Sequence, residues 1–239
     1  MLMAELDIII PVFNEGEGIV RTLRALERGV KTPCSVKLCY DFDEDDTLPA
    51  VIALKDLAIT VEFVKNRGRG PHAAVLTGMA ASQAPYVLVF PADDDYNAGI
   101  VDAMVAKARD GNKIVCASRF IPGGEMRGCP LVKAVILRTA AATLHLHARV
   151  PTRDPTNGFR LFSRSLLDTV PITSDTGFTY SIELLVKCHR LGWPIAEVPA
   201  RWFERASGQS RFRVFRWGPA YLRWCAYAFA TTYLGRKTL

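Results

Sequence analysis

The sequence predicts an α/β fold in which a mainly parallel sheet is flanked by helices. Short apolar runs rich in β-branched residues recur along residues 6–117, and amphipathic stretches of helical spacing separate them. A run such as 6–12 (LDIIIPV) is typical of a strand buried on both faces. Regular alternation of strand and helix indicates right-handed βαβ units on one parallel sheet.

The elements of this first half follow one another at regular intervals. The expected strands are residues 6–12, 36–40, 59–64, 86–90 and 113–117, and the expected helices between them are residues 19–26, 48–57, 72–82 and 100–109. Ligands of such sheets bind beyond the carboxyl ends of the strands. The polar residues that follow each strand are therefore the first candidates for a site.

The second half is less regular. A loop rich in Gly and Pro, residues 120–130, precedes a long apolar helix expected at residues 131–147. After it we expect a turn and strand (154–162), a helix (178–190), a strand (195–203) and an aromatic helix (212–234). No repeat, linker or low-complexity tract divides the chain. The sequence thus predicts a main domain of residues 1–211, followed by a basic aromatic helical segment of residues 212–239.

Composition excludes several classes of protein. The 239 residues are 49% hydrophobic and 23% charged, which excludes a disordered, collagenous or coiled-coil chain. The six cysteines form no CxxC pair, and residues 1–7 carry no secretory signal. Reduced thiols and a cytoplasmic location are expected.

The net charge of +6 is concentrated at the C-terminal end. From Arg201 onward the chain has eight basic residues and one acidic residue, so the first 200 residues carry about −1. A basic tail favours an anionic partner such as lipid headgroups or phosphates, and a solvated basic face is the alternative. Nucleic acid is not expected, because acidic residues surround the predicted cleft.

Two helical segments have the composition of a membrane-surface helix. Residues 217–234 contain a single charge, Arg223, and aromatic residues throughout, which favours an interfacial helix over a membrane span. Residues 131–147 include Lys133 and Arg138 and fit the same description. Peripheral binding at the inner face of a membrane is one interpretation, and ordinary packing on the sheet is the other.

Two polar clusters follow the first two strands. Asn14 and Glu15 lie between the first strand and a helix whose N-terminal dipole favours anions, although Asn14 could instead cap that helix. The second cluster, residues 41–47 (DFDEDDT), holds five acids. Asp41 is nearest the strand end and is the candidate for binding a ligand hydroxyl or base edge, whereas Asp46 or Thr47 can cap the next helix.

A third cluster, Asp93-Asp94-Asp95, follows strand 86–90 directly. Carboxylates one residue apart at a strand end can converge on Mg²⁺ or Mn²⁺, which complete their shells with water and phosphate oxygens. A cap for the following helix is the alternative, but three consecutive acids exceed what capping needs. The cluster therefore predicts a site for a metal and a diphosphate.

Basic and glycine-rich segments could complement these acids. Glycines allow the backbone to approach a phosphate closely. The candidate residues are Arg67 and Arg69 (NRGRG), Arg119, Arg160, and Arg205 and Arg211, which flank Gly208-Gln209-Ser210. Each of these arginines taken alone is more typical of a surface residue.

Taken together and in order, eight segments resemble glycosyltransferase family 2. They are IIIPVFNE, YDFDEDDT, NRGRGPHAAVLTGM, VFPADDDYN, SRFIPGG, DPTNGFRLFSR, FTYSIELLVKCHRLGWPIAEVP and FERASGQSRF, within residues 6–215. The similarity is greatest to the branch with dolichyl-phosphate mannosyltransferase and related polyprenyl-phosphate sugar transferases. It implies the GT-A fold with a Rossmann-like sheet and an amphipathic C-terminal helix, a nucleotide-sugar donor, and Mg²⁺ or Mn²⁺ at a DxD-type motif.

The resemblance also implies roles for individual residues. Metal-binding positions are matched by Asp93 and Asp95. Donor-binding positions are assigned to Pro11, Asn14, Glu15, Asp41, Arg69, Asp94, Arg160, Ser210 and Arg211. The phosphate-contacting segments are matched by Arg119, Arg205, Ser210 and Arg211. Our candidates for the catalytic residues are Asp154, Arg119 and Arg205. The segment after the acceptor helix is matched by Asp154, Gly158, Phe159 and Arg160.

Three departures from the family pattern leave alternatives open. Pro91 replaces the first acid of the usual metal motif, so the pattern does not decide which two of the three aspartates 93–95 hold the metal. Tyr40 and Asp43 replace the usual Asp and Ser, which leaves the nucleobase open. No pair of transmembrane helices follows the domain, so a lipid acceptor implies peripheral membrane binding.

The implied reaction is attack of an acceptor oxygen on the anomeric carbon of a nucleotide-bound sugar, with inversion. A polyprenyl-phosphate acceptor is already anionic and needs no general base, whereas a glycan hydroxyl needs a carboxylate, for which Asp154 is the candidate. Two other functions stay open: a sugar-1-phosphate nucleotidyltransferase and a non-catalytic membrane-docking module.

Overall fold

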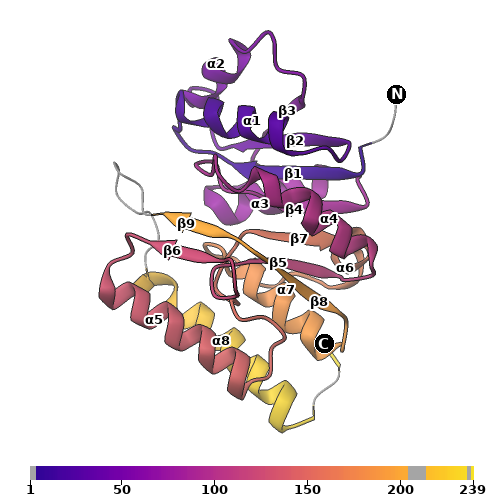
Figure 1. The fold of residues 1–239 in the computed structure, drawn as a ribbon, viewed down its shortest axis with the longest axis vertical. Helices are drawn as coiled ribbons and strands as arrows, with labels where there is room; N and C mark the ends of the chain where they lie inside the picture. The colour runs from indigo at the N-terminus through magenta and orange to yellow at the C-terminus, as the bar shows by residue number, and fades with distance from the viewer. Residues whose placement is uncertain (1–3, 204–213, 236–237) are drawn as a thin grey trace.

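The computed structural model in Figure 1 describes residues 4–203, 214–235 and 238–239. Its central sheet has seven strands in the order β3-β2-β1-β4-β7-β5-β8. These are β1 (Leu6–Pro11), β2 (Cys34–Tyr40), β3 (Thr60–Lys65), β4 (Tyr86–Val89), β5 (Ile114–Ser118), β7 (Arg160–Ser163) and β8 (Ile195–Pro199). All five strands predicted in the first half of the chain are present.

The predicted mainly parallel sheet is confirmed, with one reversal. β1 pairs parallel with both β2 and β4, and β5 pairs parallel with β8. β7 lies between β4 and β5 and runs antiparallel to both. Because of this reversal, the turn that enters β7 lies at the edge where β4 and β5 end, and it brings residues 154–159 to that edge.

Helices cover both faces of the sheet. On one face lie α1 (Gly18–Gly29), the short η1 (Ala98–Ile100) and α4 (Val101–Arg109), and on the other lie α3 (Gly70–Ala81), α7 (Thr179–Arg190) and α8 (Val214–Tyr233). Each face of the sheet packs against its helices in a separate hydrophobic core. Side chains along β1 alternate between the two faces, so Ile8 and Ile10 pack in the first core and Ile9 packs in the second. This two-sided burial explains the continuous apolar run that predicted the strand.

Several elements differ from the sequence prediction. The helix expected at 131–147 is α5 (Leu131–Ala142) followed by a π-helical turn, η2 (Thr143–His147), and the helix expected at 48–57 is the shorter α2 (Thr47–Ile52). The strand expected at 195–203 divides, because β9 (Arg201–Phe203) leaves the main sheet and pairs with β6 (Glu125–Arg127). α6 (Arg164–Thr169) was not expected.

α5 and α8 both lie at the bottom of Figure 1, away from β1–β3. α8 packs on α7 through the buried side chains of Trp224 and Ala228. A hydrogen bond from Thr232 Oγ1 to the Ala148 carbonyl (2.6 Å) ties α8 to the end of η2. Within the described ranges, none of the helices combines the length and hydropathy that a membrane span requires.

Candidate functional site

The loops that follow β1, β2 and β4 lie at one edge of the sheet. They share this edge because β1 is parallel to both of its neighbours. Asn14 and Glu15, Asp41, and Asp93 therefore follow three adjacent strands. Pro11 is the last residue of β1 and is half-buried.

Asp41 is held at the start of α3. Its Oδ2 accepts a hydrogen bond from the Gly70 backbone N–H (2.8 Å), and its Oδ1 accepts one from the Asn66 side-chain amide (2.6 Å). The carboxyl residue is half-buried, and Arg69, which precedes Gly70, is exposed. The turn of the NRGRG segment thus orients Asp41 at the edge of the sheet and leaves Arg69 available to solvent.

The three consecutive aspartates divide into two kinds. Asp93 and Asp95 are exposed, whereas Asp94 is 4% exposed. Asp94 accepts hydrogen bonds from the backbone N–H groups of Tyr96 (3.2 Å) and Asn97 (2.9 Å) and from the Asn97 side chain (2.6 Å). Burial raises the pKa of Asp94 to about 6.

This arrangement corrects the donor contact predicted for Asp94, whose carboxylate faces inward and organises the turn. Asn97, which Asp94 orients, also clamps β9. Its side chain donates to the Arg201 carbonyl (2.7 Å) and accepts from the Arg201 N–H (3.0 Å). β9 leads directly into residues 204–213, so the predicted site residues Arg205, Ser210 and Arg211 lie outside the described residues.

The exposed pair, Asp93 and Asp95, has the donor atoms that a hard divalent cation requires. Asp95 lines a hollow of about 430 Å³ beside α1, together with Val20, Arg21, Arg24 and Arg28, and Asp93 is not among its lining residues. Oδ2 of Asp95 lies 3.9 Å from Nε of Arg21. Among the described residues, no three His, Cys, Asp or Glu side chains form a closed metal cage. An open set of carboxylate oxygens suits Mg²⁺ or Mn²⁺, which take further oxygens from water and phosphate.

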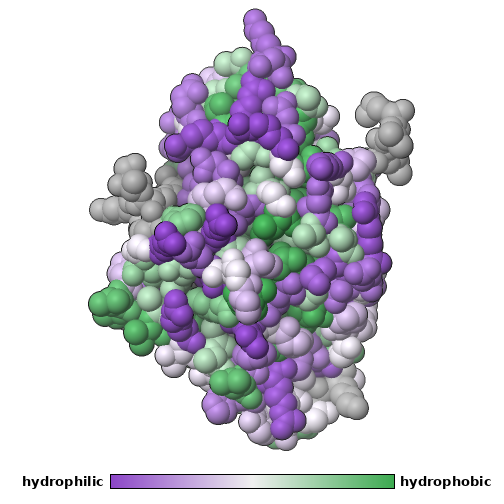
Figure 2. Space-filling model, in the orientation of Figure 1, coloured by the Kyte–Doolittle hydropathy of each residue, from purple (hydrophilic) through white to green (hydrophobic). Residues whose placement is uncertain are grey.

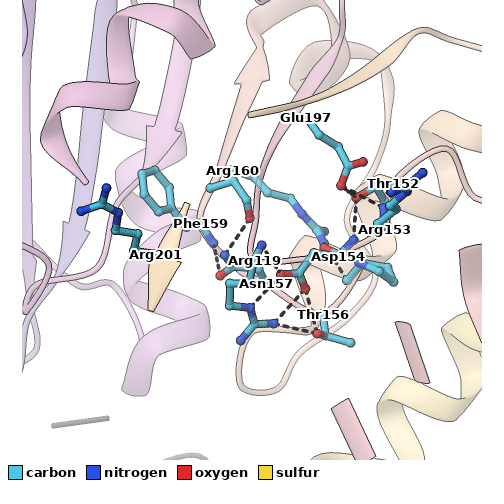
Figure 3. Close-up of polar contacts among 12 residues, drawn as sticks. Arg119, Thr152, Arg153, Asp154, Thr156, Asn157, Phe159, Arg160, Glu197 and Arg201 are labelled. Atoms are coloured by element: carbon cyan, nitrogen blue, oxygen red, sulfur yellow. Dashed lines mark hydrogen bonds and ion pairs between the residues drawn. The ribbon is translucent and has the colours of Figure 1, made fainter. Parts of the chain in front are cut away.

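At the end of β5, Arg119 forms a buried ion pair with Asp154 (Figure 3). Its Nε donates to Asp154 Oδ2 (2.7 Å), and its Nη2 donates to Asp154 Oδ1 (2.8 Å) and to Thr156 Oγ1 (3.0 Å). The backbone N–H of Arg119 also donates to Asp154 Oδ2 (3.0 Å).

Burial alone would raise the pKa of Asp154, but the charge and hydrogen bonds of Arg119 outweigh this effect and lower it. Asp154 is fully buried. The geometry therefore makes Asp154 the anchor of Arg119, and a carboxylate with a lowered pKa is a weak general base.

Arg160 is fully buried and faces the interior of the protein. Its guanidinium donates to the backbone carbonyls of Ser181 (2.5 Å) and Pro155 (2.6 Å). This position corrects the direct donor contact predicted for Arg160, because its charge holds the 154–159 turn against α7 instead. Phe159, the preceding residue, packs edge-on against Phe90 with ring centroids 4.8 Å apart.

Arg138 was not among the predicted site residues, but it lies near Arg119. The guanidinium carbons of Arg138 and Arg119 lie 5.3 and 5.1 Å from the centroid of the Phe120 ring. Arg138 is exposed on α5. The available signal was that it is one of only two Lys or Arg residues in the apolar segment 131–147. Asp45 and Thr47 were also missed: from the sequence, Thr47 was expected only as a possible helix cap and Asp45 had no predicted role.

Comparison with known proteins gives a consistent result. A family model, Glycosyl transferase family 2, matches residues 7–171. A dolichyl-phosphate hexose transferase of Haloferax volcanii is 28% identical over 216 residues, which cover 90% of each chain. An uncharacterized glycosyltransferase of Mycobacterium tuberculosis is 27% identical over 205 residues, or 85% of this chain and 88% of that one.

Solved structures share the fold. Glucosyl-3-phosphoglycerate synthase from Mycobacterium tuberculosis, in complex with Mn²⁺, uridine diphosphate and glucosyl-3-phosphoglycerate, is 20% identical with a TM-score of 0.65 over 98% of this chain and 80% of that chain. The same enzyme with uridine diphosphate gives a TM-score of 0.68 at 20% identity, over 93% and 80% of the two chains. The predicted GT-A fold is confirmed by this similarity.

The match to residues 7–171 contains the ends of β1, β2, β4 and β5 and the turn that enters β7, so it includes all the described candidate residues. The expectation drawn from the sequence motifs and the match of the family model agree, and the chain belongs to glycosyl transferase family 2 and is a glycosyltransferase.

Proposed function

We propose that this enzyme transfers a sugar, with inversion, from a nucleotide-sugar donor to a polyprenyl phosphate. The donor occupies the carboxyl edge of β1, β2 and β4, where Asn14, Glu15 and Asp41 meet its nucleoside. Asp93 and Asp95 hold Mg²⁺ or Mn²⁺, which, when bound, neutralises the leaving diphosphate. The solved relatives were crystallised with uridine diphosphate and Mn²⁺ or Mg²⁺, which supports this donor class.

The burial of Asp154 and its pairing with Arg119 are the observations on which the choice of acceptor rests. A hydroxyl acceptor must lose a proton, but the carboxylate at the acceptor side is buried and bound by Arg119 through two nitrogens. A phosphate acceptor needs no base and is attracted by the guanidinium groups next to Phe120. The dolichyl-phosphate hexose transferase of Haloferax volcanii supports the same class of acceptor.

A binding screen followed by a transfer assay tests this function. Nucleoside diphosphates with Mn²⁺ are expected to raise the Tm, because a ligand that binds only the folded state stabilises it by mass action. A radiolabelled sugar should then pass from the matching nucleotide sugar to a short-chain polyprenyl phosphate, with release of nucleoside diphosphate. Consumption of a nucleoside triphosphate would indicate a nucleotidyltransferase instead, and binding of vesicles without transfer would indicate a docking module.

A lipid acceptor also requires a surface that meets the bilayer, and α5 supplies one. Figure 2 shows hydrophobic side chains at the surface where α5 begins, at the lower left. Leu131 is 84% exposed and Val135 is 62% exposed. The exposed large apolar residues of α5 and η2 are Leu131, Val132, Val135, Ile136 and Leu146. Neither α5 nor α8 contains Asp or Glu, so their charges favour an anionic bilayer.

Vesicle sedimentation with a double variant, Leu131→Glu with Val135→Glu, tests this surface. We expect binding to phosphatidylglycerol vesicles to weaken at least about tenfold, because two apolar side chains no longer enter the lipid and two negative charges are added. Ile52→Glu is the matched control, since Ile52 is 67% exposed on α2 at the opposite end of the molecule. Equal binding by the double variant and the control would exclude α5 as the docking surface.

A further inference from the structure

Three consecutive backbone amides of the β1–α1 loop are bound by three consecutive residues where the β2–α2 loop enters α2. The N–H of Asn14 lies 3.1 Å from each carboxylate oxygen of Asp45. The N–H of Glu15 donates to Thr47 Oγ1 (3.0 Å), and the N–H of Gly16 donates to Asp46 Oδ1 (2.8 Å). The acidic run after β2 therefore supplies the hydrogen-bond acceptors for the amides of the neighbouring loop.

The two buried acceptor residues, Asp45 and Thr47, are well positioned to hold the loop. Asp45 and Thr47 are both fully buried, and Asp45 Oδ1 also accepts the Thr47 N–H (2.9 Å). The loop they hold has an uncommon backbone conformation, with φ of +51° at Asn14 and +50° at Gly16. A non-glycine residue in the left-handed region persists only when its surroundings hold it there.

The same β2–α2 loop is tied to α3 at its other end. Asp41, at the beginning of this loop, accepts hydrogen bonds from Asn66 and Gly70. Phe42, the next residue, packs edge-on against Phe13 with ring centroids 5.5 Å apart. One loop thus sets the positions of both the 13–16 segment and Asp41, which are the groups assigned to the nucleoside of the donor.

We propose that Asp45 and Thr47 are positioning residues for the donor: they hold the backbone of residues 14–16 and so place the side chains that bind the nucleotide. Neither residue touches the donor in this proposal. It rests on the proposed function only for the identity of the ligand. The conformation of the loop depends on Asp45 and Thr47 whatever the ligand is.

The buried threonine allows a matched pair of variants. Thr47→Val keeps the shape but loses the hydroxyl that accepts the Glu15 amide, and Thr47→Ser keeps the hydroxyl. Asp45→Asn removes the charge and one of the two carboxylate oxygens. Glu44→Gln is the control, because Glu44 is an exposed acid of the same run.

Two measurements are made on each full-length variant. In hydrogen exchange, the peptide containing amides 14–16 should exchange at least about tenfold faster in Thr47→Val and Asp45→Asn than in the wild type, with the strands of the core unchanged. The Kd of uridine diphosphate or guanosine diphosphate with Mn²⁺ and the KM of the donor should rise by about the same factor, with kcat at saturating donor changed less than about threefold. Thr47→Ser and Glu44→Gln should resemble the wild type.

The two possible failures are distinguishable. If the wild type binds no nucleoside diphosphate, the proposed function is wrong, while the exchange experiment still decides whether Asp45 and Thr47 hold the loop. Unchanged exchange at residues 14–16 in both Thr47→Val and Asp45→Asn overturns the inference. So does equal loss of nucleotide affinity in Thr47→Ser and Thr47→Val, or a loss of kcat without a change in KM, since positioning of the donor predicts neither.

Discussion

Replacing Asp154 by alanine is expected to lower the free energy of unfolding by about 3–5 kcal/mol, because it leaves the Arg119 guanidinium buried without its counter-charge. The Arg119 side chain is 7% exposed and that of Asp154 is 0% exposed, so water cannot take over the lost interaction. Urea denaturation measures the change. The double variant Arg119→Met with Asp154→Asn removes both charges and is expected to recover most of the loss.

The pH dependence of stability has a defined sign. Arg119 lowers the pKa of Asp154 in the folded protein, so the unfolded chain binds more protons at low pH. The ion pair therefore makes its full contribution to the free energy of unfolding when the pH is above the pKa of Asp154 in the unfolded chain. This contribution is lost as the pH falls through the pKa of Asp154 in the folded protein. The double variant should lack this component. A double variant as unstable as Asp154→Ala would contradict the pairing.

Kinetics separate the anchoring role of Asp154 from general-base catalysis. With a polyprenyl-phosphate acceptor, Asp154→Asn is expected to keep turnover within about tenfold of the wild type, since no proton has to be removed from the acceptor. A loss of a hundredfold or more in a well-folded Asp154→Asn protein, together with loss of the acidic limb of the pH–rate profile, would identify Asp154 as a base and favour a hydroxyl acceptor.

The sequence predicted the strands of the parallel half well, and for a simple reason. Ile8, Ile9 and Ile10 are buried on alternating faces, so their apolar run records a two-sided core directly. The direction of β7 could not be predicted from the sequence in this way. The apolar pattern of a strand is the same whichever way the strand runs, and the reversal comes from the turn at residues 154–159, which Arg160 and Asn157 hold from inside.

The composition of the site was predictable, but the direction in which each side chain faces was not. Three identical aspartates in a row carry no sign of which one turns inward, and the structure selects Asp94 through Asn97. Arginine is rarely buried, so nothing in the sequence indicated that Arg160 lies in the core. The Arg119 pair was also beyond sequence reasoning, since Asp154 lies 35 residues further along the chain.

Removal of either exposed carboxylate of the DDD cluster is expected to have the largest effect on catalysis. Asp93→Ala and Asp95→Ala should each lower kcat by about a hundredfold or more, because the charge that develops on the leaving diphosphate is no longer neutralised. Asp110→Ala is the control for loss of an exposed acid, since Asp110 follows α4. The Tm should change little in all three variants, because none of these side chains is buried.

Metal removal gives the same prediction without a mutation. Excess chelator should abolish sugar transfer by the wild type, and Mn²⁺ or Mg²⁺ in excess over the chelator should restore it. The conservative variants Asp93→Asn and Asp95→Asn keep the size of the side chain but not its charge, so they should require a higher Mn²⁺ concentration for half-maximal activity than the wild type. If chelated enzyme keeps full activity, or if Asp93→Ala and Asp95→Ala match Asp110→Ala, the diphosphate must be neutralised by arginines instead of by a cation at this cluster.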